Sequence, residues 1–469
     1  MNTKKYLVAI CALICGLLAP LPIAAQTPAP QKQTPPAGGQ PKPFNVPKRE
    51  TLTLPNGMRV SLVPYGDVPK VSVQAVIRAG NVNETAEQIW LADMTAEMLK
   101  EGTTETSAEQ IAQQAALMGG SLGVAVAPDQ TNVGIDVLSE RGPDAVLLLA
   151  GVIRRPSLPA SEVARFKTNY LRRLNVARAQ PGSLATERFH KLLYPNHAYG
   201  RIFPTEAMIN NYTIDDFKKF YAANYGAART HIYVAGKFDA AAMKRALTQG
   251  FGEWASGTPP LMNVPQPVAA RVIHLIDRPG APQSTINLGL PVVAPGNRDY
   301  LPLLVTNSLL GGSFASRITS NIREAKGYTY SPFSQLSVRY RDAYWMQVAD
   351  VTTAVTGPSL KEIFYEIDRL QKEPPSAAEL EGIQNYMAGV FVLRNSTRQG
   401  LIGQLAFIDL HGLDEKYIAD YVRNVLAVTP PDVQRIARDY LKADKMTIVV
   451  VGDKEKIAQQ VGEFGEVMN

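Results

Sequence analysis

Histidine and cysteine are scarce in this chain of 469 residues. Both cysteines, Cys11 and Cys15, lie near the N-terminus, so a chain processed beyond them has no thiol, and a disulfide framework is excluded. The first of the five histidines is His190. No helix before that point can therefore place two imidazoles one turn apart to hold a metal ion.

Long apolar runs are absent after the first 25 residues. Residues 1–25 are typical of a secretory signal peptide, with Lys4 and Lys5, an apolar run over residues 6–19 and small residues up to Ala25. We expect cleavage, which gives an exported protein, periplasmic or extracellular, with no membrane span. A leader retained as an N-terminal anchor is the alternative.

A strong charge imbalance is also absent from the main part of the chain. The formal net charge is +6, but the leader lysines and the basic residues between 26 and 50 supply most of it, and about +1 remains from Thr51 onward. Nucleic-acid binding therefore has little support. Hydrophobic residues make up 45% of the chain, which indicates a globular protein of two or three domains.

Proline-rich stretches divide the chain. Residues 26–50 predict an extended, disordered tether rich in Pro, Gly and Gln, and residues 257–271 predict a linker. The segments between and after them, residues 51–256 and 272–469, each have the size of a single domain.

The two segments repeat one another at an offset of 216 residues. Pro159 matches Pro375 at the start of a long helical segment, and Thr213-x-x-Asp216 matches Thr429-x-x-Asp432 as a helix-capping pattern. In each segment, short strands precede a run of helices, followed by a last strand and helix. This order favours α+β domains in which helices are layered on a mostly antiparallel sheet. We therefore predict two homologous domains.

Residues 90–103 predict an amphipathic helix that ends at Gly102. Leu91, Met94 and Met98 recur at helical spacing on one stripe. Asp93 and Glu97 are neighbours one turn apart on the remaining surface.

Six short motifs follow one another along the chain. They are Leu54–Val60, Arg78–Asn81, Met98–Thr103, Tyr194–Gly200, Leu310–Arg317 and Arg323–Tyr330. In this order they resemble the pitrilysin/insulinase family of zinc peptidases, the inverzincins. The resemblance covers essentially residues 50–469 and implies that the two domains form one half of a clamshell.

Active members of this family carry His-x-x-Glu-His on the first helix, with two histidines for zinc and a glutamate that activates water. When the sequences are aligned on residues 98–103, Asp93 and Glu97 replace the histidines and Ala96 replaces the glutamate. The family's third ligand falls at or beside Arg173, whose guanidinium cannot coordinate a cation. The resemblance thus implies a non-catalytic type of subunit that binds no zinc and has no catalytic residue of its own. Asp93 and Glu97 then form either a solvated helix face or a polar contact to Arg173 or a partner.

The second domain keeps a further family motif. In the family, an Arg and a Tyr from this region reach the active site and hold substrate carbonyls or the oxyanion of the intermediate. Here the matching residues are Arg323 with Tyr328 or Tyr330. The alternative is a surface pair of Arg323 with Glu324 and tyrosines packed in the core. Residues 310–313 resemble the family's glycine-rich loop facing the substrate.

One motif points to different chemistry. Gly119–Gly123 fits the G-x-S-x-G pattern of serine hydrolases, but a helix precedes it and a strand follows, the reverse of the order that a nucleophile elbow needs. The histidines are scattered singly, and His231, inside a predicted strand, is expected to pack.

Two functions follow from the resemblance. In the first, the chain is the non-catalytic subunit of a heterodimeric exported zinc peptidase. A partner with His-x-x-Glu-His binds the zinc, while this chain completes the chamber and binds extended peptides. In the second, it is a stand-alone exported peptide-binding or assembly protein with a degenerate peptidase fold.

Overall fold

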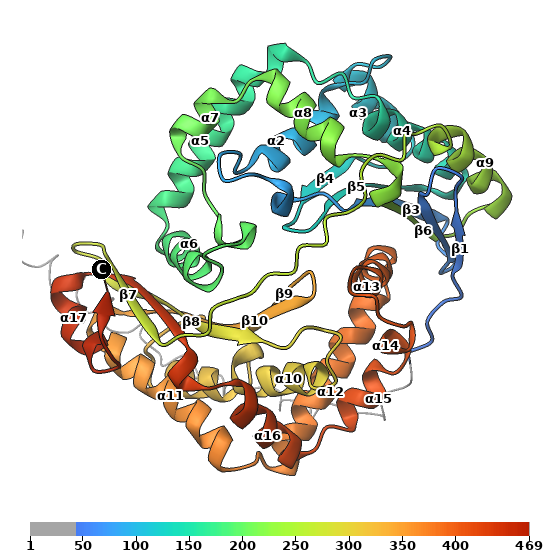
Figure 1. The fold of residues 1–469 in the computed structure, drawn as a ribbon. Helices are drawn as coiled ribbons and strands as arrows, with labels where there is room; N and C mark the ends of the chain where they lie inside the picture. The colour runs from blue at the N-terminus through green and yellow to red at the C-terminus, as the bar shows by residue number, and fades with distance from the viewer. Residues whose placement is uncertain (1–43, 469) are drawn as a thin grey trace, which may run out of the picture. The chain divides into compact units, whose positions relative to one another are not determined.

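The computed structural model of the protein describes residues 44–468. The predicted leader and most of the predicted tether therefore lie outside the described residues. The described chain contains two six-stranded sheets, one built from its first half and one from its second half (Figure 1).

The first sheet has the strand order β1-β2-β6-β3-β5-β4, and only β2 and β6 pair in parallel. Its strands are β1 (Glu50–Thr53), β2 (Arg59–Pro64), β3 (Lys70–Ile77), β4 (Gly123–Val126), β5 (Thr131–Leu138) and β6 (Thr230–Gly236).

The second sheet has the order β12-β7-β11-β8-β10-β9, in which β7 pairs in parallel with both β11 and β12. Its strands are β7 (Val272–Asp277), β8 (Gln283–Val292), β9 (Phe333–Arg339), β10 (Asp342–Thr352), β11 (Thr447–Gly452) and β12 (Val467–Met468). The other three pairings are antiparallel.

The prediction of a duplicated, mostly antiparallel α+β fold is confirmed. Strands β2-β6-β3-β5-β4 and β7-β11-β8-β10-β9 have the same order in the two sheets, and only the edge strands β1 and β12 differ. The repeated capping pattern is also present. The side chains of Asp216 and Asp432 accept hydrogen bonds from the backbone N–H groups of Thr213 and Thr429 at 2.7 and 3.0 Å.

Helices surround both sheets (Figure 1). The first half contributes α2 (Leu91–Met98), α3 (Ala108–Leu117), α4 (Gly142–Arg154), α5 (Val163–Ala179), α6 (Pro181–Leu193), α7 (Glu206–Asn211), α8 (Ile214–Asn224) and α9 (Ala240–Phe251). The second half contributes α10 (Tyr300–Asn307), α11 (Thr356–Lys372), α12 (Ala377–Asn395), α13 (Arg398–His411), α14 (Lys416–Ala419), α15 (Tyr421–Leu426), α16 (Pro430–Tyr440) and α17 (Lys454–Gly462). Within residues 44–468, no helix combines the length and apolar character needed to cross a membrane.

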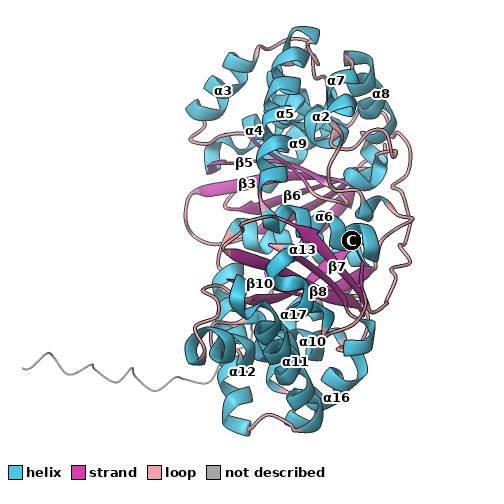
Figure 2. Ribbon diagram, turned by 90° about the vertical axis from the view of Figure 1, so that its left-hand side faces the viewer, coloured by secondary structure: helices cyan, strands magenta, loops and turns pink. Residues whose placement is uncertain are grey.

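The two halves exchange one helix each. Helix α6 of the first half packs on β8 and β11 of the second sheet, while α13 of the second half packs on β3 and β6 of the first. Both helices lie between the two sheets (Figure 2). The 216-residue offset of the repeat relates them, so the exchange is reciprocal.

This exchange buries the sheet faces that the local helices leave open. Phe189 and Leu193 of α6 pack with Met346 and Val451 in one apolar cluster. Leu401, Leu405 and Ile408 of α13 pack with strands of the first sheet in another cluster. Because both faces of β3 are covered, its side chains are buried or half-buried along its whole length, without a solvent-facing side.

The last residues of the predicted tether pack against the fold. Phe44 contacts Phe391 of α12 edge to face, with ring centroids 5.5 Å apart. Arg49 donates to Asp409 at 2.9 Å and to Glu415 at 2.7 Å. Residues 44–49 therefore pack against the fold, whereas the sequence predicted a free extended segment over 26–50. Their contact partners lie far away in the sequence, so a local pattern could not reveal these contacts.

Candidate functional site

Helix α2, at the centre of the candidate site, is shorter and more buried than predicted. It spans Leu91–Met98, and residues 99–101 continue as one 3₁₀ turn before Gly102, whose φ of +124° ends the helix. Trp90 precedes the helix in the left-handed region, with φ of 70°. The predicted stripe of Leu91, Met94 and Met98 is buried, but Ala96 on the other surface is buried as well, so little of the helix faces solvent. Neighbouring helix α8 and strand β4 cover the surface that a sequence pattern assigns to solvent.

Asp93 and Glu97 do not form a solvated face, and that reading is wrong. Both side chains are half-buried. Asp93 accepts a hydrogen bond of 2.7 Å from Asn81, which lies in the turn after β3. Burial raises the pKa of Asp93, while the Asn81 hydrogen bond and the nearby Arg173 charge act in the opposite direction. The hydrogen bond of Asp93 is therefore with Asn81, and Arg173 acts on Asp93 through its charge without forming an ion pair.

A second carboxyl group lies beside Asp93. Glu84 is 5% exposed, and its Oε1 accepts hydrogen bonds from the Ala92 N–H at 2.8 Å and from Asn81 Nδ2 at 3.3 Å. Burial, with a smaller contribution from the Asp93 charge, raises the pKa of Glu84 to about 8. Glu84 is therefore mostly protonated and neutral at pH 7.

Arg173 of α5 lies over aromatic rings at the same place. Its guanidinium carbon is 5.1 Å from the centroid of the Trp90 ring and 5.5 Å from that of the Tyr170 ring. Burial and the carboxylates of Glu97 and Asp93 raise the pKa of Tyr170. Arg173 and Asp93 line one cavity of about 390 Å³.

These residues do not fit a zinc ion. Ala96 has only a methyl group, Asp93 is already engaged by Asn81, and the Arg173 guanidinium would repel a cation. Over residues 44–468, no group of three or more His, Cys, Asp or Glu side chains is arranged to hold a metal.

The structure does not place Arg323 at this cavity. Arg323 lies in a π-helical turn, Thr319–Ala325, with its guanidinium carbon 4.5 Å from the Phe314 ring centroid and 4.8 Å from that of Tyr330. Its Nε is 3.1 Å from Glu324 Oε1. Tyr330 is 79% exposed, whereas Tyr328 packs against the core of the second half.

The glycine-rich stretch before Arg323 is helical. Residues 308–312 form a π-helical turn that continues α10, and Gly311 is buried. A Cβ atom at Gly311 would lie 2.6 Å from Ser334 Oγ. Residues 310–312 are therefore helical and do not form the predicted loop, because the small residue at Gly311 allows close packing against β9.

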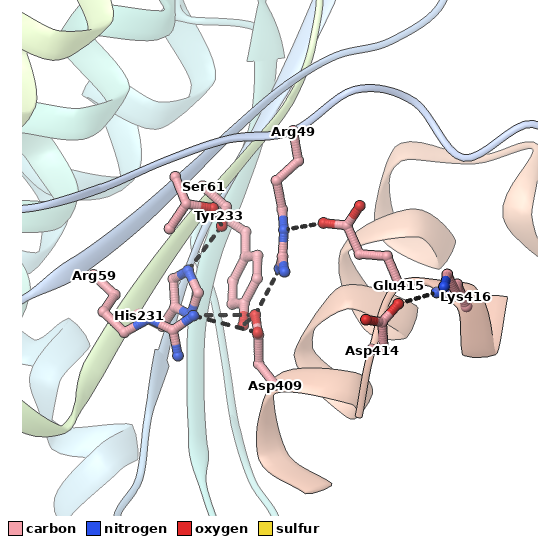
Figure 3. A network of polar contacts seen from close by, with 10 residues as sticks. Arg49, Arg59, Ser61, His231, Tyr233, Asp409, Asp414, Glu415 and Lys416 are labelled. Atoms are coloured by element: carbon pink, nitrogen blue, oxygen red, sulfur yellow. Dashed lines mark hydrogen bonds and ion pairs between the residues drawn. The ribbon is translucent and has the colours of Figure 1, made fainter. Parts of the chain in front are cut away.

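Ser61, His231 and Asp409 are arranged in space like a serine hydrolase triad, but they are not accessible to a substrate (Figure 3). Ser61 Oγ lies 2.9 Å from His231 Nε2, and His231 Nδ1 lies 3.4 Å from Asp409. Ser61 is 0% exposed, so a substrate cannot reach its hydroxyl. Burial lowers the pKa of His231 to about 3. The packing role predicted for His231 is confirmed.

The Gly119–Gly123 motif does follow a helix and precede a strand, as predicted.

Sequence reasoning missed Arg201 and Arg339, which line the same cavity as Asp93 and Arg173. Arg201 follows the Tyr194–Gly200 motif, and Arg339 ends β9 in the other half. His190 of α6 also lines the cavity, between the backbone oxygen of Tyr199 at 3.0 Å and the Tyr344 hydroxyl at 2.9 Å. Its pKa falls to about 4, through burial first and then the Arg339 charge, so the ring is neutral.

Two protein-family models match most of the described chain. The model described as Insulinase (Peptidase family M16) matches residues 63–204, and that described as Peptidase M16 inactive domain matches residues 211–387.

The relatives extend over nearly the whole chain. An uncharacterized zinc protease of Bacillus subtilis, YmxG, is 24% identical over 84% of this chain and 95% of its own length. The zinc protease PqqE of Helicobacter pylori is 24% identical over 86% of this chain and 93% of its own length.

Two solved structures share the fold. The peptidase M16 inactive domain from Pseudomonas fluorescens has a TM-score of 0.79 at 24% identity, covering 86% of this chain and 98% of that one. A protease from Helicobacter pylori has a TM-score of 0.80 at 20% identity, covering 87% of this chain and 100% of that one.

Proposed function

Because this chain belongs to the insulinase family of peptidases, peptidase family M16, we propose that it is the non-catalytic subunit of an exported heterodimeric zinc peptidase. A partner subunit that carries His-x-x-Glu-His binds the zinc and cleaves the substrate. This chain completes the chamber and contributes to binding of extended peptides, whose backbone can pair with a sheet edge.

The observation that carries the proposal is the Arg173 guanidinium beside Asp93. In the family register Asp93 stands at a zinc-ligand position and the third ligand falls at or beside Arg173. Here Asp93 is hydrogen-bonded to Asn81 and is influenced by the positive charge of Arg173. Relatives of similar length are named zinc proteases. A chain that has their fold but lacks the zinc ligands is consistent with a subunit that assists a catalytic partner.

The geometry around Arg323 supports a contribution to substrate binding. Its guanidinium lies close to two exposed aromatic rings, Phe314 and Tyr330, which restrict its orientation. The carboxylate that pairs with it, Glu324, is exposed, so water weakens that ion pair. Tyr330 is the better candidate than Tyr328 for a contact with peptide, because Tyr328 packs in the core.

Co-expression with a homologue that has an intact His-x-x-Glu-His motif tests this role. Zinc-dependent cleavage of a fluorogenic peptide should require both subunits. Arg323→Ala should lower kcat/KM roughly 10- to 100-fold, the effect of losing one hydrogen bond from a charged donor. Arg438→Ala, an exposed arginine on α16, is the matched control and should leave the rate unchanged.

If the partner together with the Arg323→Ala variant cleaves the peptide at an unchanged rate, the role assigned to Arg323 is refuted. If the partner cleaves equally well without this chain, the subunit hypothesis fails. Peptide binding by this chain alone would then support the second candidate, a stand-alone peptide-binding protein, for which the cavity beside Asp93 offers a specific site.

A further inference from the structure

Three arginines from separate parts of the chain line the cavity beside Asp93. Arg173 comes from α5, Arg201 follows the 3₁₀ turn Ala198–Gly200, and Arg339 ends β9 of the second sheet. Asp93 is the single carboxylate among the lining residues. The wall of the cavity therefore has an excess of positive charge.

None of these three guanidinium groups has a carboxylate oxygen within 4.0 Å among residues 44–468, as the ion pairs of that region involve other arginines. Arg173 contacts aromatic rings, and Arg201 donates to the backbone oxygen of Glu84 at 2.8 Å. Arg339 donates to the backbone oxygen of Val338 at 2.9 Å and to Ser337 Oγ at 3.1 Å, and its buried Nε has no hydrogen-bond partner among residues 44–468.

An arginine with a buried N–H group and no counter-ion is unfavourable, since the lost hydration is not replaced. Arg339 is in this state. Together with Arg173 and Arg201 it makes the cavity wall positive, so the site gains by binding an anion. Guanidinium groups match the two oxygens of a carboxylate, which they can bind through paired N–H donors.

The cavity has room for more than a bare anion. Its volume of about 390 Å³ lies in the range of pockets for organic ligands, and a water molecule takes only about 30 Å³. Trp90, Phe203, Ile202 and Pro128 supply an apolar wall. The rings of Trp90 and Phe203 pack edge to face, with their centroids 5.8 Å apart. A carboxylate joined to an apolar body matches both parts of this lining.

We propose that this cavity binds the C-terminal end of a peptide, with its free α-carboxylate held by Arg173, Arg201 and Arg339 and its last side chain against Trp90 and Phe203. The choice of a peptide over another organic carboxylate rests on the proposed function. At the position of the family's third zinc ligand, Arg173 thus supplies a positive charge suited to a carboxylate.

Fluorescence anisotropy of the purified chain without any partner tests the site. The probes are a fluorescein-labelled Ala-Ala-Ala-Phe peptide with a free C-terminus and the same peptide as its C-terminal amide. We expect the free acid to bind at least 10-fold more tightly than the amide. Its affinity should fall as salt is raised, because the contact is between charges.

Two variants and a control locate the binding site. Arg173→Gln and Arg339→Gln should each weaken binding of the free acid about 10-fold or more and leave binding of the amide unchanged. Arg172→Gln changes the adjacent, exposed arginine of the same helix, which does not line the cavity, and should have no effect. Thermal unfolding of each variant checks that the fold is intact. Arg173 is exposed, so its variant keeps the test valid even if Arg339→Gln unfolds.

Equal binding of acid and amide, or full binding by Arg173→Gln, would overturn the proposal. Displacement of the peptide by inorganic phosphate at equal concentration would also overturn it, because the site would then recognise any small anion. This assay contains no partner subunit. A chain that binds the free acid but does not assist a peptidase would thus refute the proposed function and leave this site standing.

Discussion

Replacing Glu84 with glutamine should stabilise the protein at alkaline pH and have little effect at acidic pH. Glu84 is buried beside Asp93 and accepts hydrogen bonds from Ala92 and Asn81. Glutamine retains the oxygen that accepts both bonds, and it cannot ionise. The substitution therefore removes the buried negative charge while keeping the contacts of the side chain.

The sign follows from the pKa of Glu84, which rises from an ordinary 4.5 to about 8 in the folded protein. Between these values the folded state holds a proton that the unfolded state has released. Stability from this group is therefore complete below pH 4.5 and is lost as pH rises through 8. At 1.36 kcal/mol per pH unit, the full loss is roughly 5 kcal/mol, an upper value because the site can relax or admit water.

Denaturant unfolding of the wild type and Glu84→Gln from pH 5 to pH 9 measures this difference. We expect similar unfolding free energies at pH 5 and an advantage of at least about 2 kcal/mol for the variant at pH 9. Glu87→Gln, an exposed neighbour, is the control and should show no such trend. If the unfolding free energies of the wild type and Glu84→Gln change with pH in the same way, or if the variant is the less stable protein at pH 9, the assignment of a buried neutral carboxyl is refuted.

Two further predictions concern the contacts that hold the fold. Asp409→Asn removes the carboxylate charge that accepts hydrogen bonds from Arg49 and Tyr233 (Figure 3). It should lower the unfolding free energy by about 3 kcal/mol, whereas Glu415→Gln, at an exposed partner of Arg49, should lower it by less than about 1 kcal/mol. Equal losses for the two variants in thermal or denaturant unfolding would contradict this. Gly236→Ala should cost at least about 2 kcal/mol, because Gly236 has φ of +133° and a Cβ would lie 2.3 Å from the Lys70 backbone oxygen. Gly389→Ala, on an open part of α12, should instead gain about 0.5 to 1 kcal/mol, and a loss there comparable to that of Gly236→Ala would show that backbone strain is not the cause.

The sequence predicted those features that depend on neighbouring residues. The capping patterns at Thr213 and Thr429 are local, and the repeat at 216 residues shows that the second half reproduces the first. The exchange of α6 and α13 was not predictable in this way. It depends on which sheet face each helix covers, and an amphipathic helix does not reveal its partner.

The candidate site shows the same division. Asp93, Ala96, Glu97 and Arg173 could be singled out because they replace residues of a known motif. The solvated face expected for Asp93 was wrong, since contact with Asn81 and burial of α2 come from distant packing. Arg339 reaches the cavity from the second sheet, and no spacing in the sequence connects it with Asp93.

The zinc content of the purified full chain tests the central claim most directly. Metal analysis after exposure to equimolar zinc and gel filtration should find far less than one zinc per chain, with no peptide cleavage by the chain alone. Stoichiometric zinc, together with cleavage that a chelator abolishes, would contradict the account.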